Sequence, residues 1–316
     1  MSRKTPEHHE GFRLKKSSLL QLIILAVAIL IIAPQFKQFA GSWRLLGQLD
    51  IGWVILAVFA MSVSILFATL VYLFLVPEKL PFRRTAAIQL ATYFTNRLLP
   101  SGLGGIGFNA LYLVKQAKLS RTESSVYATA NNLIGFVAFM ICMWSAALFS
   151  STDLSPHIPI KIILITIGSV ALILAVVSVF IKSVQKKIID FLGHLVAVVI
   201  NIIRHPKRLV AAIFSSIGIT ISYAATLWLC SKSVGINLSV LDLFIAFLVG
   251  NTALTISPTP GGLGAVEAAI VGVLVATNID PAQALAAVVL FRLISYWAPI
   301  IPGYISFRWA TKNDYV

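Results

Sequence analysis

The chain has 316 residues, of which 58% are hydrophobic and only 11% are charged. Soluble domains carry about 25% charged residues, so this composition excludes a soluble protein and indicates an all-α polytopic membrane protein. The formal net charge of +14 is the excess expected of basic loops on the cytoplasmic side of a membrane. We therefore predict membrane lipids as partners and no nucleic acid.

Long apolar runs predict about six transmembrane helices. A helix needs about 20 residues to cross a hydrocarbon core of about 30 Å. The first run follows a basic tail and ends at Pro34 without a small-residue cleavage site, so we interpret it as a retained helix and not as a signal peptide. The predicted spans are 17–33, 52–76, 124–150, 160–181, 209–231 and 282–307.

Two further apolar segments, 85–115 and 240–279, are interrupted by proline and glycine, and we predict a helical hairpin for each. The arms of the first, 85–99 and 101–115, reach only about 22 Å at 1.5 Å per residue. They are too short to cross the membrane, which predicts a hairpin that re-enters on the cytoplasmic side. The arms of the second are longer, so it either re-enters or crosses twice.

The distribution of basic residues predicts how the spans are oriented. If both hairpins return to the side from which they start, 19 of the 25 lysines and arginines fall on one side and four on the other. Cytoplasmic loops carry such an excess. We therefore expect both termini, 1–16 and 311–316, in the cytoplasm and the protein in the cell (inner) membrane.

The two interruptions resemble each other and predict an internal repeat. "LPSGLGGIG" begins at Leu99 and "TPGGLGAVE" at Thr259, a constant offset of 160 residues. Each interruption lies between two full spans, and the hairpins start from opposite sides, which is the inverted-topology repeat of many transporters. We predict one transmembrane domain over 17–310, divided into repeat one (51–150), a connector (183–206) and repeat two (209–307).

The connector between the repeats has the pattern of an amphipathic helix. Lys187, Asp190, His194, Asn201 and Arg204 fall on one stripe at helical spacing, opposite isoleucine, leucine and valine. We expect this helix to lie on the cytoplasmic membrane surface.

The glycine-rich turns are candidate binding elements. Main chain that leaves the helix at membrane depth leaves polar groups unpaired, and it is tolerated where it lines protein or a water-filled cavity. In the second turn Pro260 ends one arm, and Gly261, Gly262 and Gly264 allow the chain to turn. The amides that begin the next arm would favour an anion such as phosphate. The alternative is that these glycines only allow tight helix packing.

Three charged residues lie inside apolar sequence, where ionisable groups usually face a cavity or a partner. Glu267 and Arg292 are expected to pair for structure alone, or, as the alternative, Arg292 contacts a phosphate and Glu267 orients it or exchanges a proton. Arg97 either holds an anionic headgroup through its planar guanidinium or extends toward the interface, and Tyr93 beside it is expected to be an interfacial or packing residue. The candidate lipid-headgroup residues are Arg97, Pro100, Gly102, Gly104, Pro260, Gly261, Gly262, Gly264, Glu267 and Arg292. The histidines, cysteines and carboxylates form no metal-binding pattern, and we predict no cofactor.

The stretches "SPTPGGLGAVEAAIVGVL" and "LFRLISYWAPIIPGYISF" resemble the signature of the lysylphosphatidylglycerol synthase transmembrane family, also called flippase-like domain proteins. Its hallmarks are a P-G-G-x-G-x-x-E turn and a downstream arginine in an aromatic, proline-containing last span. The resemblance covers about 17–310. The first half departs from the pattern at Phe108 and Asn109, where family members commonly carry an acidic residue followed by arginine.

The resemblance implies a membrane protein that translocates, or helps to translocate, a lipid with a charged headgroup between leaflets. The alternative is a non-transporting scaffold or accessory subunit for an enzyme of envelope lipid or glycolipid synthesis. Better-known relatives carry a cytosolic domain that aminoacylates phosphatidylglycerol, and this sequence shows no such domain after its last span. Because it also shows no nucleophile–base set, metal set or nucleotide loop, we do not expect an enzyme.

Overall fold

The computed structural model describes residues 49–98, 103–149, 182–257 and 259–316. All regular secondary structure in these ranges is helical, as predicted. Several predicted features lie outside the described residues, and these are the tail 1–16, the spans 17–33 and 160–181, Pro100 and Gly102.

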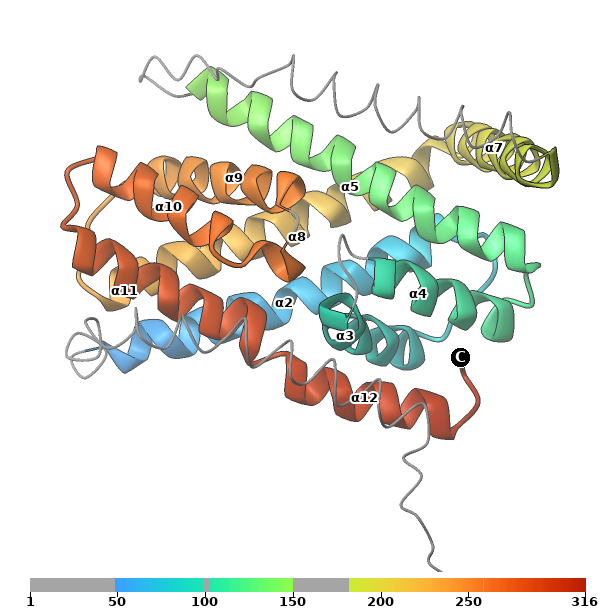
Figure 1. Cartoon of the computed structure of the whole chain (residues 1–316), viewed down its shortest axis with the longest axis horizontal. Coiled ribbons are helices and arrows are strands. Elements are labelled where there is room, and N and C mark those ends of the chain that lie inside the picture. The colour runs from blue at the N-terminus through green and yellow to red at the C-terminus, as the bar shows by residue number, and fades with distance from the viewer. Residues whose placement is uncertain (1–48, 99–102, 150–181, 258) are drawn as a thin grey trace, which may run out of the picture.

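The helices follow one another with short connections (Figure 1). In chain order they are α2 (Ile51–Leu75), α3 (Phe82–Leu98), α4 (Leu103–Gln116), α5 (Arg121–Phe149), α7 (Lys182–Arg204), α8 (Pro206–Ser233), α9 (Val240–Ile256), the short turn η2 (Pro260–Gly262), α10 (Ala265–Ala276), α11 (Pro281–Arg292), the π-turn η3 (Leu293–Trp297) and α12 (Ile300–Lys312).

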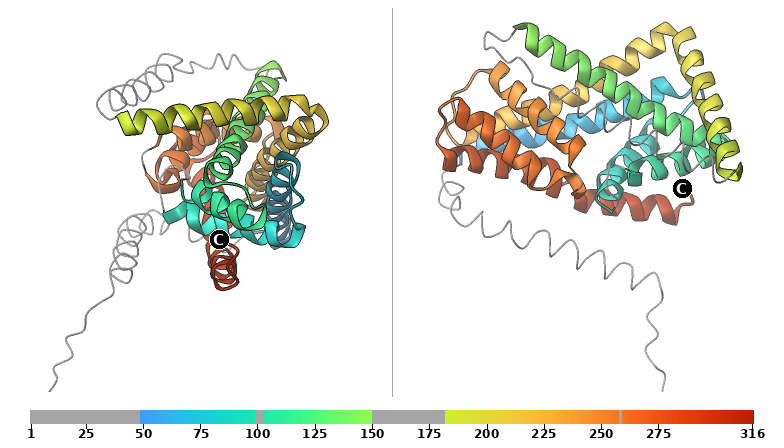
Figure 2. Two further views of the ribbon diagram at one scale, coloured as in Figure 1. Left: turned by 90° about the vertical axis from the view of Figure 1, so that its right-hand side faces the viewer. Right: turned by 45° about the horizontal axis from the view of Figure 1, so that its top comes forward.

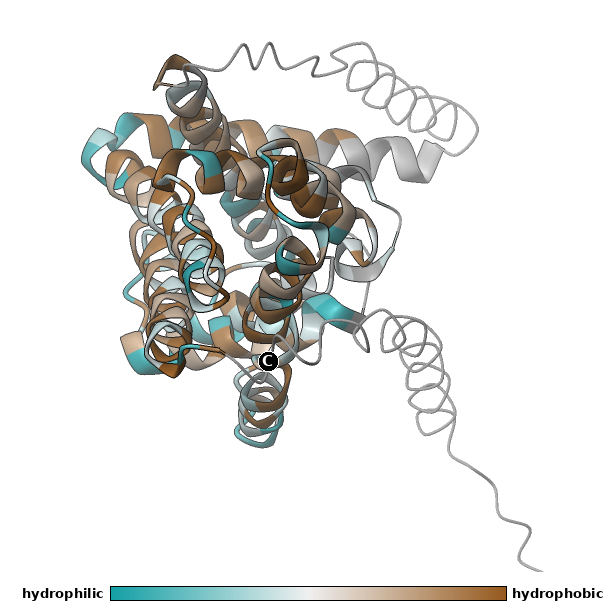
Figure 3. Ribbon diagram, turned by 90° about the vertical axis from the view of Figure 1, so that its left-hand side faces the viewer, coloured by the Kyte–Doolittle hydropathy of each residue, from teal (hydrophilic) through white to brown (hydrophobic). Residues whose placement is uncertain are grey.

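Four helices are long and apolar enough to cross a membrane, and they correspond to the predicted spans within the described ranges. They are Ile51–Leu75, Arg121–Ala146, Pro206–Ser233 and the combined helix Pro281–Lys312. Brown, hydrophobic residues predominate along the helices in Figure 3, and many large apolar side chains of these four are exposed. Phe59, Phe136 and Phe214, for example, are each more than 60% exposed, which is the surface that a lipid environment requires.

Local sequence explains where these helices begin. Asp50 caps α2 by accepting a hydrogen bond from the amide of Gly52 at 2.9 Å, and Asp280 caps α11 in the same way. Pro281 and Pro206 occupy the first positions of α11 and α8, where the missing N–H has no cost.

The two predicted hairpins are present as α3–α4 and α9–α10, and each pair of arms packs together. They start from opposite ends of the molecule, and their tips point toward its middle (Figure 1). Each hairpin is followed by another helix, α5 after the first and α11 after the second. These two helices start at Arg121 and Pro281, which are 160 residues apart. This separation of 160 residues is the same as that between the two glycine-rich turns.

The two halves meet along α2 and α8, whose contact is the most extensive between any two of the described helices. The aromatic rings of Trp53 and Trp228 form an edge-to-face contact, with their centroids 6.0 Å apart. Gly218 of α8 lies directly under Phe67 of α2, and a Cβ there would meet the ring at 2.6 Å. A glycine at this position therefore allows the two spans to approach closely.

The buried side chains form two clusters, one around each hairpin. Leu243, Ile270 and Leu274 belong to the cluster around α9 and α10. Ile88 and Tyr112 belong to the cluster around α3 and α4. Between the two hairpins, α3 contacts η2 at the tip of the second.

Helix α7 lies across one end of the bundle and not along it (Figure 2). It packs against α5 and α8. Several of its apolar residues are exposed at helical spacing, namely Ile189, Leu192, Val196, Ile200 and Ile203. This matches the pattern of a helix at a membrane surface.

Candidate functional site

The tip of the second hairpin is built from glycines in backbone conformations that other residues avoid. Gly261, Gly262 and Gly264 have positive φ angles of 64°, 64° and 87°. Helix α9 ends at Ile256, and α10 begins directly after Gly264. The turn is therefore encoded by its glycines, because a left-handed conformation costs an ordinary residue about 1–2 kcal/mol.

An ion pair at this tip connects the second hairpin to the last helix. Arg292 Nε donates to Glu267 Oε1 at 2.7 Å, and Arg292 Nη2 donates to the carbonyl of Gly261, also at 2.7 Å. The second carboxylate oxygen of Glu267 accepts from the amide of Gly264 at 2.7 Å. The side chains of Glu267 and Arg292 are only 19% and 9% exposed. The structure thus brings these predicted residues together as a shielded, hydrogen-bonded pair.

Tyr296 packs directly against this turn. A Cβ at Gly261 would overlap its ring. Tyr296 lies in the π-turn, where the amide of Ala298 bonds to the carbonyl of Leu293, five residues earlier. The predicted span 282–307 is therefore interrupted within its length. Pro299 lacks an N–H and cannot bond to the Ser295 carbonyl as a helical residue would, which explains the irregularity.

Arg97 reaches this region from the tip of the first hairpin. Its Nη2 donates to the Ser295 carbonyl at 3.3 Å. Its guanidinium carbon lies 4.6 Å from the ring centroid of Tyr296 and 5.4 Å from that of Tyr93. The guanidinium carbon of Arg292 lies 4.7 Å from the same Tyr296 ring. Two arginines, one from each half, thus share one aromatic ring.

The hydrogen bonds of Arg97 are incomplete within the described part of the chain. Its Nε is buried without a hydrogen-bond partner there, and the bond to Ser295 is long. The Tyr93 hydroxyl, by contrast, exchanges a 2.8 Å hydrogen bond with Ser64 of α2. Tyr93 is therefore held by its own partner and supplies Arg97 with a ring face.

The first hairpin is closed by neutral hydrogen bonds. Asn96 Oδ1 accepts from the amide of Gly105 at 2.7 Å, and Gln89 Nε2 donates to Asn109 Oδ1 at 2.8 Å. The predicted site residue Gly104 lies within α4, and a Cβ there would overlap the main-chain carbonyl of Thr95. Gly104 therefore allows α3 and α4 to approach closely.

Sequence reasoning did not identify Tyr296 as part of this site, and it expected Tyr93 to be an interfacial or packing residue. A signal was present, because Tyr93 precedes Arg97 by four residues and Tyr296 follows Arg292 by four. Residues four apart meet on a helix surface. The carbonyl of Ser295 carries no comparable signal in the sequence.

The charge balance favours an anion at this point. Arg97, Arg292 and Glu267 together carry a net charge of +1, and no other carboxylate is ion-paired to either arginine among the described residues. A guanidinium suits a phosphate or carboxylate because its planar donors match their oxygens. The arrangement can therefore bind an anion at Arg97 while Arg292 keeps its protein partners.

Comparison with known proteins places the chain in a family. Residues 18–303 match the family described as the lysylphosphatidylglycerol synthase TM region. A UPF0104 membrane protein of Methanocaldococcus jannaschii is 28% identical over 232 residues, which cover 70% of this chain and 95% of that protein. A UPF0104 membrane protein of Pyrococcus horikoshii is 21% identical over 326 residues, covering 90% and 95%. The match extends over nearly the whole chain and includes the glycine turn and both residues of the ion pair. The chain therefore belongs to the lysylphosphatidylglycerol synthase transmembrane-region family.

Proposed function

We propose that this protein moves a lipid with a charged headgroup between the leaflets of the membrane, and that Arg97 holds the headgroup phosphate. The observation that carries the proposal is the partly buried guanidinium of Arg97, which lies against the Tyr296 ring and whose buried Nε has no hydrogen-bond partner in the described part of the chain. Burying a cation at membrane depth costs several kcal/mol. A bound anion would offset that cost.

The two arginines have different roles in this proposal. Arg292 already donates short hydrogen bonds to Glu267 and to the Gly261 carbonyl, so it positions the second tip and the shared ring of Tyr296. Among the described residues Arg97 has a single long hydrogen bond, which leaves donors for a ligand. We therefore assign direct contact with the headgroup to Arg97 and positioning to Arg292.

The arrangement of the hairpins suggests how a headgroup could pass. The tips approach from opposite ends of the molecule (Figure 1), so movement of either hairpin would open the site toward a different leaflet. The apolar outer surface of the spans would leave the acyl chains in the bilayer. No chemical change of the lipid is required.

We also propose that the protein lies in the cell (inner) membrane with its C-terminus in the cytoplasm. The end of the molecule that carries α7 and the C-terminus is the basic one in the described ranges, as expected for a cytoplasmic surface. Cysteines placed at Lys79 and Lys118 should then react with an impermeant reagent from the cytoplasmic side, and cysteines at Asn237 and Asn278 from the other. Labelling of positions 79 and 118 from opposite sides would contradict this topology.

Leaflet exchange in proteoliposomes tests the proposed function. The purified protein should accelerate exchange of a fluorescent phosphatidylglycerol, and Arg97→Gln should reduce the rate roughly 10- to 100-fold, the equivalent of one charge-assisted hydrogen bond of about 1.5–3 kcal/mol. Arg97→Lys keeps the charge but loses the planar donor fork, so it should retain an intermediate rate. Arg84→Gln is the matched control, because Arg84 is an exposed arginine on the same helix.

Two results would contradict the proposal. Equal exchange rates for the native protein and Arg97→Gln would remove Arg97 from the path. No exchange by the native protein, together with co-purification of a lipid-synthesising enzyme, would instead favour the role of an accessory subunit. Size-exclusion profiles and thermal unfolding of each variant separate loss of transport from loss of folding.

A further inference from the structure

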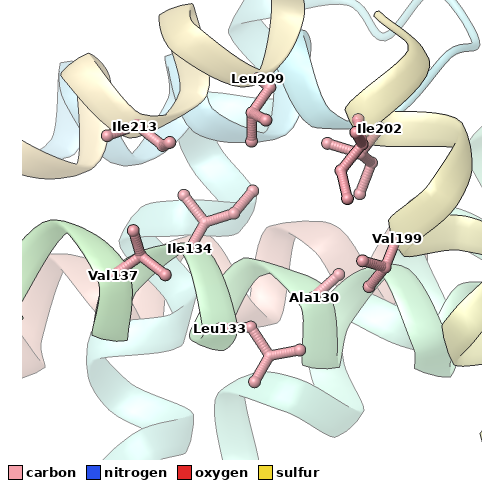
Figure 4. Close-up of a pocket in the computed structure, with 9 residues that line it drawn as sticks. Ala130, Leu133, Ile134, Val137, Val199, Ile202, Leu209 and Ile213 are labelled. Atoms are coloured by element: carbon pink, nitrogen blue, oxygen red, sulfur yellow. The ribbon is translucent and has the colours of Figure 1, made fainter. Parts of the chain in front are cut away.

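A groove lined only by aliphatic side chains lies where α5, α7 and α8 meet, away from the arginine site. Figure 4 shows these side chains converging from the three helices. The groove has a volume of about 160 Å³, which is below the range of roughly 300–1,000 Å³ that is usual for small-molecule sites. Its lining residues are Ala130, Leu133, Ile134, Val137, Val199, Ile202, Ile203, Leu209 and Ile213.

The groove opens onto the surface that faces lipid. Leu133, Val137 and Ile203 line it and are 45%, 44% and 59% exposed. Phe136, on the adjoining surface of α5, is 61% exposed. A flexible hydrocarbon chain in the bilayer can therefore enter from the side.

A sharp corner in the chain places positive charge beside this groove. Helix α7 ends at Arg204 and α8 begins at Pro206, with only His205 between them. Pro206 lacks an N–H and disfavours helical geometry at the residue before it, and His205 has a non-helical φ of −113° and ψ of 68°. The corner converts the surface helix α7 into the transmembrane helix α8.

Three exposed cations lie at this corner. Arg204 directly follows the lining residue Ile203, and Arg208 directly precedes the lining residue Leu209. Lys207 lies between them on the same turn, and none of the three forms an ion pair within the described part of the chain. Exposed cations next to an apolar groove at a membrane surface are complementary to an anionic lipid, whose charge lies just outside its acyl chains.

We infer that this corner is a binding site for an anionic phospholipid, with one acyl chain in the aliphatic groove and the phosphate against Arg204 and Arg208. This site needs no translocation activity, and it is separate from the Arg97 site. The lipid would fix α7 against α5 and α8 at one membrane surface.

Native mass spectrometry of the full chain, released from nanodiscs of equal parts phosphatidylglycerol and phosphatidylcholine, tests the site. The native protein should retain phosphatidylglycerol in preference to phosphatidylcholine. The double variant Arg204→Gln, Arg208→Gln should lower this preference by roughly fivefold per charge removed, which corresponds to about 1 kcal/mol for each basic residue near an anionic surface. Lys79→Gln with Arg83→Gln is the matched control, because it removes two exposed cations from the same end of the molecule.

A second variant tests the groove itself. Leu133→Trp should fill it and lower retention of both lipids, whereas Phe136→Trp, three residues further along α5 and outside the groove, should not. Both positions are exposed, so neither tryptophan has to enter the packed core. The inference is overturned if the native protein shows no lipid preference, or if the control charge variant loses as much preference as the corner variant. It is also overturned if Leu133→Trp and Phe136→Trp retain equal amounts of lipid, which would leave the groove to another part of this chain or to a second copy.

Discussion

The two hairpin tips have similar outlines but are held by different interactions. At the offset of 160 that aligns the glycine turns, Glu267 corresponds to Gly107 and Arg292 to Asn132. Gly107 is exposed with open space around its Cβ position, and the Asn132 amide bonds within its own helix, to the Ala128 carbonyl at 3.3 Å. The ion pair of the second tip therefore has no counterpart at these positions of the first.

In the proposed function, this difference separates a positioning element from the element that contacts the headgroup. The second tip is fixed to the last helix by a shielded pair and a bond to a main-chain carbonyl. The first tip contributes Arg97, whose long bond to the Ser295 carbonyl connects it to the same helix. An inverted repeat can thus keep its outline while one half supplies rigidity and the other supplies an available cation.

The largest effect should come from breaking the ion pair. Glu267→Ala leaves Arg292 shielded and without its carboxylate, so the free energy of unfolding should fall by about 3–5 kcal/mol. Adding Arg292→Met should recover much of this loss, because the pair is then replaced by apolar atoms. Thermal unfolding of the detergent-solubilised variants provides the measurement.

Asn96→Ala is the matched change in the first tip. It removes one neutral hydrogen bond to the Gly105 amide, so the expected loss is about 1 kcal/mol. If Asn96→Ala destabilises the protein as much as Glu267→Ala, or if the double variant remains as unstable as the single one, the second tip is not held mainly by charge.

Smaller losses of stability, which differ from one position to the next, are expected when glycines of the two hairpins are replaced by alanine. Gly261→Ala combines a φ of 64° with a Cβ that overlaps the Tyr296 ring, whereas Gly264→Ala has a φ of 87° and open space around the Cβ. We expect Gly264→Ala to cost about 1–2 kcal/mol from the backbone alone and Gly261→Ala to cost more. Gly107→Ala, in an exposed helical position, should be neutral or stabilising by up to about 1 kcal/mol. Equal melting temperatures for Gly261→Ala and Gly264→Ala would show that Tyr296 does not press on the turn.

Much of the fold could be predicted from the sequence because strong local signals mark it. Proline and glycine mark the two hairpins, whose first pair of arms was expected at 85–99 and 101–115 and occurs at Phe82–Leu98 and Leu103–Gln116. The pairing of Glu267 with Arg292 was also expected, because two opposite charges in apolar sequence are each costly alone. Their contact with a lipid stays a prediction.

The rest depends on rotational register, which the sequence does not reveal directly. Tyr296 lies within the π-turn, which changes the rotational register of the residues that follow it relative to a regular helix over 282–307. The contact between Arg97 and Ser295 joins residues 198 positions apart. No local pattern specifies such a contact in advance.

The interrupted last helix has a mechanical consequence. Its first part, α11, packs on α10, and its last part, α12, packs along α3, so the last helix touches both hairpins, one on each side of the π-turn that holds Tyr296. Displacing the first hairpin would move Arg97 relative to the Tyr296 ring, and displacing the second would move Gly261, which packs against the same ring. Coupling of the hairpins through this ring would obey linkage, so whatever stabilises a displaced position of one hairpin would also alter the equilibrium of the other.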